Sequence, residues 1–270
     1  LAAGLAWSLL PGAPDPLGAM VVGEGTDEAP KNQLRTLSTR QLNAGLAHVK
    51  TGRLADAATE FRGAISLDPG NREAYLSLAM ALVVGRDTAR TRPIVRTVQQ
   101  RFGAGVTDLA VAGHAAWIDG DVQAAARAWA AIPVARAREA AAAAKKGRRA
   151  KAPALPYIAV SRQAWATTLA DTPGDSDANL ALAQLDLFAG DAAAALKRLE
   201  PLTGNLEGAR AFAEACLFAA ATGQGEKSVV RAIRALAEIE GADSFALQKR
   251  LRTLLAPKGA AQPSRVGRAR

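Results

Sequence analysis

The residues of this chain that could carry out chemistry are few and lie far apart. Its one cysteine, Cys216, and its two histidines, His48 and His114, belong to the types most used as nucleophiles, general bases and transition-metal ligands. None of them has a partner at the spacing of a metal-ligand pair, and a lone cysteine cannot form an internal disulfide. We therefore expect no metal, no cofactor and no enzymatic activity.

Each of these residues also has a structural interpretation. Cys216 lies in the apolar run 212–221, which favours a buried thiol over a reactive one. His48 is expected to pack between helices, and His114 either packs or contacts a partner. The segment 223–226 lacks the preceding strand and the Lys-Ser/Thr ending of a phosphate loop, so we interpret it as a turn between helices.

The composition predicts the elements that must position these residues. Hydrophobic residues make up 49% of the 270-residue chain and aromatic residues only 4%. The apolar share is therefore carried by Ala and Leu, which are strong helix formers. Alternation of Val, Ile, Thr and aromatic residues, which is typical of strands, is hard to find. The sequence predicts an all-α fold.

Small and bulky residues recur every 34 positions. Two antiparallel helices need a small residue where their backbones approach and a bulky one beside it. Gly52 and Gly120 can end a first helix in the left-handed conformation, and Pro69 follows the end of a second helix. The predicted packing residues are Gly45, Ala57, Phe61, Pro69, Ala79, Gly113, Ala125 and Trp129.

At these positions the sequence resembles the tetratricopeptide repeat family, in its bacterial form. The match is best at Ala44-Gly45, Ala57, Phe61 and Asp68-Pro69, and it continues at Tyr75 and Leu78-Ala79. The resemblance covers roughly residues 38–240. It implies a right-handed superhelical solenoid of five to six stacked antiparallel helix hairpins with a capping helix, acting as a protein-interaction scaffold.

The register divides the chain into five parts. They are an apolar leader and flexible extension (1–36), three repeats (37–133), a degenerate repeat with a basic insert (134–175), further repeats with a capping helix (176–256), and a basic disordered tail (257–270). A linker between two short arrays is an alternative interpretation of the degenerate repeat. The largely apolar run of residues 1–10 slightly favours export or membrane anchoring, and a loosely packed apolar leader is the alternative.

The inner face of the first helices usually lines the binding groove in this family. Here that face is mostly apolar, so we hypothesise a hydrophobic groove that binds a peptide segment of another protein. Its predicted lining is Leu42, Leu46, Val49, Leu76, Met80, Val83, His114, Trp117, Leu180, Gln184 and Phe188. The alternative is that superhelical curvature or the apolar leader covers these side chains internally.

The formal net charge of +9 is concentrated in two places. Residues 136–151 carry seven basic side chains against one acidic, and residues 249–270 carry seven basic side chains and no acidic one. The predicted basic patch is Lys145, Lys146, Arg148, Arg149 and Lys151. Charge-driven binding of nucleic acid or an anionic membrane is the alternative function, and solvated surface segments are the other interpretation.

Overall fold

The computed structural model describes residues 28–145, 155–223, 227–239 and 241–255, and every regular element in that part of the chain is a helix. The elements are α1 (Glu28–Lys50), α2 (Leu54–Leu67), α3 (Arg72–Val84), α4 (Thr88–Phe102), α5 (Val106–Ile118), α6 (Val122–Ala130), α7 (Ile132–Lys145), α8 (Pro156–Asp171), α9 (Ser176–Phe188), α10 (Ala192–Leu199), the 3-10 helix η1 (Glu200–Leu202), α11 (Leu206–Ala221), α12 (Lys227–Ala237) and α13 (Ala242–Leu255). The prediction of an all-α fold is confirmed.

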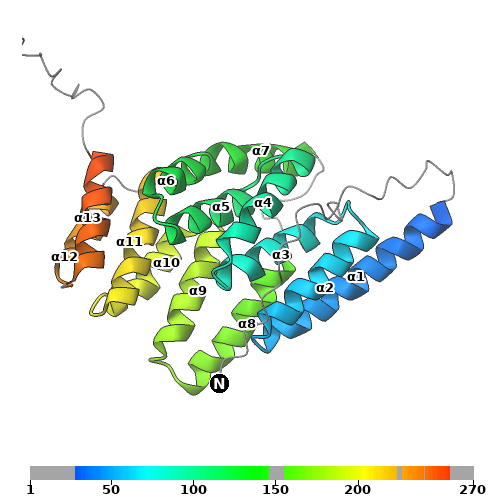
Figure 1. The fold of residues 1–270 in the computed structure, drawn as a ribbon, viewed down its shortest axis with the longest axis horizontal. Coiled ribbons are helices and arrows are strands. Elements are labelled where there is room, and N and C mark those ends of the chain that lie inside the picture. The colour runs from blue at the N-terminus through cyan, green and yellow to red at the C-terminus, as the bar shows by residue number, and fades with distance from the viewer. Residues whose placement is uncertain (1–27, 146–154, 224–226, 240, 256–270) are drawn as a thin grey trace, which may run out of the picture.

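Helices that follow each other in sequence pack as hairpins (Figure 1). The pairs within the described residues are α1 with α2, α3 with α4, α5 with α6, α9 with α10, and α11 with α12. The last helix, α13, packs on α12. Stacked hairpins are therefore confirmed, and the right-handed superhelix stays a prediction.

The turns inside the hairpins repeat one backbone conformation. Gly52, Gly120 and Gly190 have φ values of 72°, 75° and 79°. Arg86 occupies the equivalent turn of the second hairpin with φ 61°. Among the described residues it is the only non-glycine residue with a positive φ. Left-handed φ strains an L side chain, so glycine is favoured at these positions. The shared φ angle places the three turns at residues 52, 86 and 120 in the 34-residue register.

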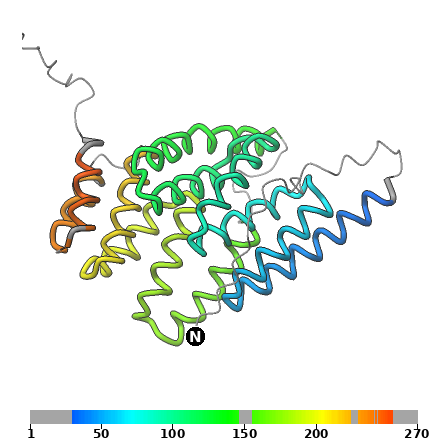
Figure 2. Tube along the Cα trace, in the orientation of Figure 1, coloured from blue at the N-terminus to red at the C-terminus, as the bar shows by residue number. Residues whose placement is uncertain are grey.

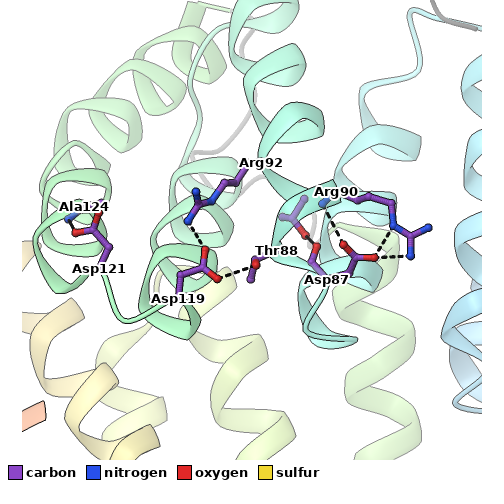
Figure 3. A network of polar contacts seen from close by, with 8 residues as sticks. Asp87, Thr88, Arg90, Arg92, Asp119, Asp121 and Ala124 are labelled. Carbon is purple, nitrogen blue, oxygen red and sulfur yellow. Dashed lines mark hydrogen bonds and ion pairs between the residues drawn. The ribbon is translucent and has the colours of Figure 1, made fainter. Parts of the chain in front are cut away.

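An aspartate directly after the turn caps the following helix in several hairpins (Figure 3). Asp87 accepts a hydrogen bond from the backbone N–H of Arg90 at 3.0 Å, and Asp121 accepts one from Ala124 at 2.9 Å. Burial acts to raise the pKa of Asp87, but the hydrogen bonds and charge of Arg90 outweigh it and lower that pKa. Arg53, at the same place in the first hairpin, makes no side-chain cap bond.

Polar contacts also join the second hairpin to the third. Asp119, at the end of α5, accepts a hydrogen bond from the Thr88 hydroxyl at 2.8 Å and forms an ion pair with Arg92, both on α4 (Figure 3). These contacts fix the relative position of two neighbouring turns on the surface. Because the ion pair is largely exposed, it contributes little to stability.

The first helix starts earlier than expected. Residues 28–36 were predicted to belong to a flexible extension, but α1 begins at Glu28 and runs past the end of α2 (Figure 1). This stretch is rich in Lys, Gln, Leu and Arg, which are good helix formers, so it is helical without being buried. Leu34 in this stretch and Leu37 just after it are 44% and 41% exposed.

The second half of the chain packs against the first half and does not simply extend the stack. Helix α8 contacts α1, α3 and α9, while α9 also contacts α5, and α11 contacts α6. The tubes of α8 and α9 lie beside α1, α3 and α5 in Figures 1 and 2. Helices α7 and α8 therefore do not form the stacked hairpin expected of a degenerate repeat, because the principal partners of α8 are α1, α3 and α9. The domain boundaries remain a prediction.

Candidate functional site

The predicted groove is not open to solvent. Its apolar members are almost all buried in a continuous core, while His114, Leu180 and Gln184 are half-buried. The buried members are Leu42, Leu46, Val49, Leu76, Met80, Val83, Trp117 and Phe188, each at most 7% exposed. The expectation of an exposed apolar groove was wrong, and the alternative of internal covering describes these side chains.

Helices of the chain itself enclose this face. Within the described residues, the main partners of α1 are α2 and α8, and α3 packs against α2, α4, α5 and α8. Six of the buried members lie on α1 and α3: Leu42, Leu46, Val49, Leu76, Met80 and Val83. Apolar surface on this scale would be costly to leave in water, so enclosing it stabilises the fold.

A polar cluster joins the two halves of the chain. His114 on α5 lies between Glu214 on α11, which contacts its Nδ1, and Gln184 on α9, whose Nε2 is 2.5 Å from its Nε2. The ring of Phe188 stands edge-on to the imidazole at 5.6 Å between centroids. Both imidazole nitrogens therefore have partners within the protein. The cluster can orient three helices, but neither nitrogen is left for a substrate or a metal ion.

Replacing Glu214 by Ala is expected to lower the free energy of unfolding by about 2 kcal/mol, because a nearly buried His114 nitrogen would lose its charged partner. Glu207→Ala, on the same helix, is the matched control. Its carboxylate is largely exposed and lies 3.9 Å from Arg86, so this change is expected to cost less than about 0.5 kcal/mol. Urea denaturation of both variants measures the difference, and equal losses would contradict a joining role for the cluster.

Two buried aspartates tie further helices together. Asp186 on α9 accepts hydrogen bonds from Arg162 on α8 at 2.7 Å and from Arg198 on α10 at 2.9 Å. Asp108 on α5 accepts one from Arg72 on α3 at 3.1 Å. Burial raises the pKa of Asp108 despite its hydrogen bonds and the charge of Arg72. Because each of these groups joins one helix to another, their role is structural.

The other residues that could carry out chemistry lie in positions where they serve the fold. Cys216 is fully buried, and burial raises its pKa to about 12, so its thiol stays protonated near neutral pH. His48 is half-buried on α1. Among the residues that the structure describes, His, Cys, Asp and Glu side chains form no group of three or more that could hold a metal ion. In the same part of the chain, no helix is both long and apolar enough to span a bilayer.

The predicted basic patch falls mainly outside the described residues. Lys145 is exposed at the end of α7, whereas Lys146, Arg148, Arg149 and Lys151 lie in the segment that the structure does not describe. The predicted leader up to residue 27 and the tail from residue 257 lie outside it too. Charge-driven binding through the insert and tail therefore stays a prediction.

One surface feature was missed in the sequence. Phe245 on α13 is 65% exposed, although a helix that closes a stack is expected to present a polar outer face. Lys249 and Arg252, four and seven residues later, are exposed on the same face of the helix. We call Phe245, Lys249 and Arg252 the α13 stripe. An aromatic residue at this helical spacing from two cations was the available signal.

The chain is similar in structure to several solved proteins. The structural neighbours are tetratricopeptide repeat proteins, mostly from bacteria. A tetratricopeptide repeat protein from Parabacteroides merdae is 12% identical with a TM-score of 0.35, covering 82% of this chain and 87% of its own. PilW, a type IV pilus biogenesis factor, is 15% identical with a TM-score of 0.33, covering 81% of this chain and 98% of its own. The pilF protein of Pseudomonas aeruginosa is 15% identical with a TM-score of 0.33, covering 85% of this chain and 95% of its own.

The sequence comparisons gave no match. No protein-family model matches the chain, and no curated protein matches it. The function is therefore inferred from the residues described above.

Proposed function

We propose that this chain is a non-catalytic protein-interaction scaffold that binds a polypeptide segment of a partner. The observation that carries the proposal is the exposed Phe245 in the α13 stripe, at the end of the stack. An exposed aromatic side chain buries a large area on binding, and aromatic residues are the usual energetic centres of protein interfaces. The packed helix hairpins support such a role because they offer several surfaces on one frame.

The charges of the α13 stripe define the chemistry of the partner. Lys249 and Arg252 follow Phe245 along one face of α13, so a complementary segment presents an apolar side chain with carboxylates to one side of it. We therefore commit to an acidic amphipathic polypeptide segment as the ligand. Binding of this kind weakens as salt concentration rises, because the ion pairs at its edge are exposed.

A binding titration tests the proposal. The probe is a fluorescein-labelled amphipathic peptide with a Leu stripe flanked by Glu, and the same peptide with Lys in place of Glu is its control. Replacing Phe245 by Ser is expected to weaken binding of the acidic peptide about tenfold, the loss of one modest interface anchor. Val134→Ser on α7 is the matched control, since Val134 is 64% exposed and lies on another helix.

Three outcomes would contradict the proposal. The first is equal affinity of the wild-type chain for the acidic and the basic peptide. The second is equal weakening by the Phe245→Ser and Val134→Ser variants. The third is binding to anionic phospholipid vesicles that depends on Phe245 when neither peptide binds, because this would assign the α13 stripe to a membrane surface.

A further inference from the structure

A cleft lies between α13 and the turn that joins α5 to α6. Helix α13 packs on α12 and also contacts α6 (Figure 1). The cleft has a volume of about 430 Å³ and is lined by residues 120–123 on one side and by Ala246, Lys249 and Arg250 on the other. We call it the α6–α13 cleft. Lys249 also belongs to the α13 stripe, so the cleft and the stripe adjoin each other.

The two walls of the cleft are tied together. The Nη1 atom of Arg250 donates a hydrogen bond to the Gly120 carbonyl at 3.0 Å. A Cβ atom on Gly120 would lie 2.2 Å from that nitrogen, so a side chain at this turn would displace the guanidinium. Val122, in the α6 wall, is 4% exposed and belongs to the core. The cleft is therefore preformed, with a held turn on one side and a helix on the other.

The lining of the cleft carries more positive than negative charge. It contains the cations of Lys249 and Arg250 and one carboxylate, that of Asp121. One oxygen of this carboxylate already accepts the backbone N–H of Ala124 at 2.9 Å. Lys249 is exposed, and it forms no ion pair with another residue that the structure describes. Its ammonium group can therefore bind a carboxylate of a ligand without giving up such a pair.

The position of Lys249 on α13 sets the spacing that a ligand must match. Phe245 and Lys249 are four residues apart, which is one helical turn and about 6 Å along the helix axis. An acidic side chain that reaches the cleft therefore lies about one turn from the apolar side chain that contacts Phe245.

We propose that the α6–α13 cleft selects the partner by binding an acidic side chain placed one helical turn before or after the partner's apolar anchor. The inference rests on the proposed function and specifies the sequence pattern of its ligand. If the stripe attracted a partner by charge alone, peptides of equal composition would bind alike. A cleft makes the affinity depend on where the carboxylate stands, because only the correct spacing brings it to Lys249.

The test uses the full chain and two fluorescein-labelled helical peptides of identical composition, each with one Leu anchor. The one-turn peptide has Glu four residues before and four residues after the Leu, and the offset peptide has Glu two residues before and after it, on the opposite face. The wild-type chain is expected to bind the one-turn peptide about fivefold more tightly in fluorescence anisotropy titrations. Equal affinity, lowered alike by Phe245→Ser, would overturn the cleft and leave the scaffold proposal intact. If neither peptide bound through Phe245, the proposed function would fail, and the cleft with it.

Two charge variants locate the preference. Lys249→Gln is expected to abolish the fivefold difference between the peptides. Arg252→Gln is the matched control, because Arg252 belongs to the α13 stripe while the lining of the cleft does not include it. This control is expected to weaken both peptides alike and to keep the difference. Loss of the difference in both variants, or in neither, would overturn the proposal.

A change in the shape of the cleft gives an independent check. Ala246→Trp is expected to fill the cleft and to remove the preference for the one-turn peptide. Its matched control is Ala166→Trp on α8, which is expected to keep the preference. Both alanines are exposed, so neither change disturbs the core. A preference that persists in the Ala246→Trp chain would overturn the cleft as the binding site of the acidic side chain.

Discussion

Replacing Met80 by Asp is expected to unfold the chain or to leave it severely destabilised. Met80 is 0% exposed on α3, with α2, α4, α5 and α8 packed around that helix. An unpaired carboxylate at such a position costs at least about 4 kcal/mol. Single domains are stable by only about 5–15 kcal/mol, so this change removes much of the total. Thermal and urea denaturation measure the loss.

The control for this prediction is Val134→Asp, which makes a comparable change at a position that is 64% exposed. It is expected to change the free energy of unfolding by no more than about 0.5 kcal/mol. If the Met80→Asp protein folded normally and lost only its ability to bind a partner, Met80 would have to line an open groove, as the sequence predicted. It would also mean that the neighbouring helices do not enclose α3 in solution.

The second large effect is expected at Gly113, where the third hairpin closes. A Cβ atom placed on Gly113 would lie 2.1 Å from the Nε1 atom of Trp129. The Trp129 indole is 1% exposed, donates a hydrogen bond to the Ala110 carbonyl at 3.2 Å and packs on Phe218 with ring centroids 5.4 Å apart. Gly113→Ala must therefore displace the indole, and we expect a loss of about 3 kcal/mol in denaturation experiments, from overpacking and the lost hydrogen bond.

Two variants define the cause of this effect. Gly174→Ala is the matched control, because a Cβ atom there meets nothing within 4 Å, and it is expected to be nearly neutral. Adding Trp129→Phe to Gly113→Ala is expected to recover part of the loss, since the smaller ring leaves room for the new methyl group. If the losses in the free energy of unfolding caused by the two changes simply add, the close approach of α5 and α6 at this point is contradicted.

The hairpins could be predicted because their determinants are local. Gly52, Arg86 and Gly120 recur at one spacing and share a left-handed backbone, even though the second of them is not glycine. Gly45 faces Phe61 across the first hairpin, as Gly113 faces Trp129 across the third. A small residue opposite a bulky one sixteen positions later is visible in the sequence because both belong to the same pair of helices.

The arrangement of the two halves could not be predicted in the same way. The sequence of α8 predicts a helix, but it does not show which helices that helix packs against. The pairing of His114 with Glu214 spans 100 residues and follows no repeat. The apolar side chains on the first helices were predicted to line an open groove. That prediction was wrong because the helices that enclose them come partly from distant parts of the chain, which leaves no local pattern.

The contacts between the two halves have a consequence for how this chain unfolds. In an open solenoid each unit touches only its neighbours, so stability is close to a sum over units, and the ends can melt first. Here the bonds from His114 to Glu214 and from Arg250 to the Gly120 carbonyl link residues 100 and 130 positions apart. Loss of an early hairpin therefore removes support from a late one. Cooperativity extends along the whole array, at the cost of slow, non-local steps during folding.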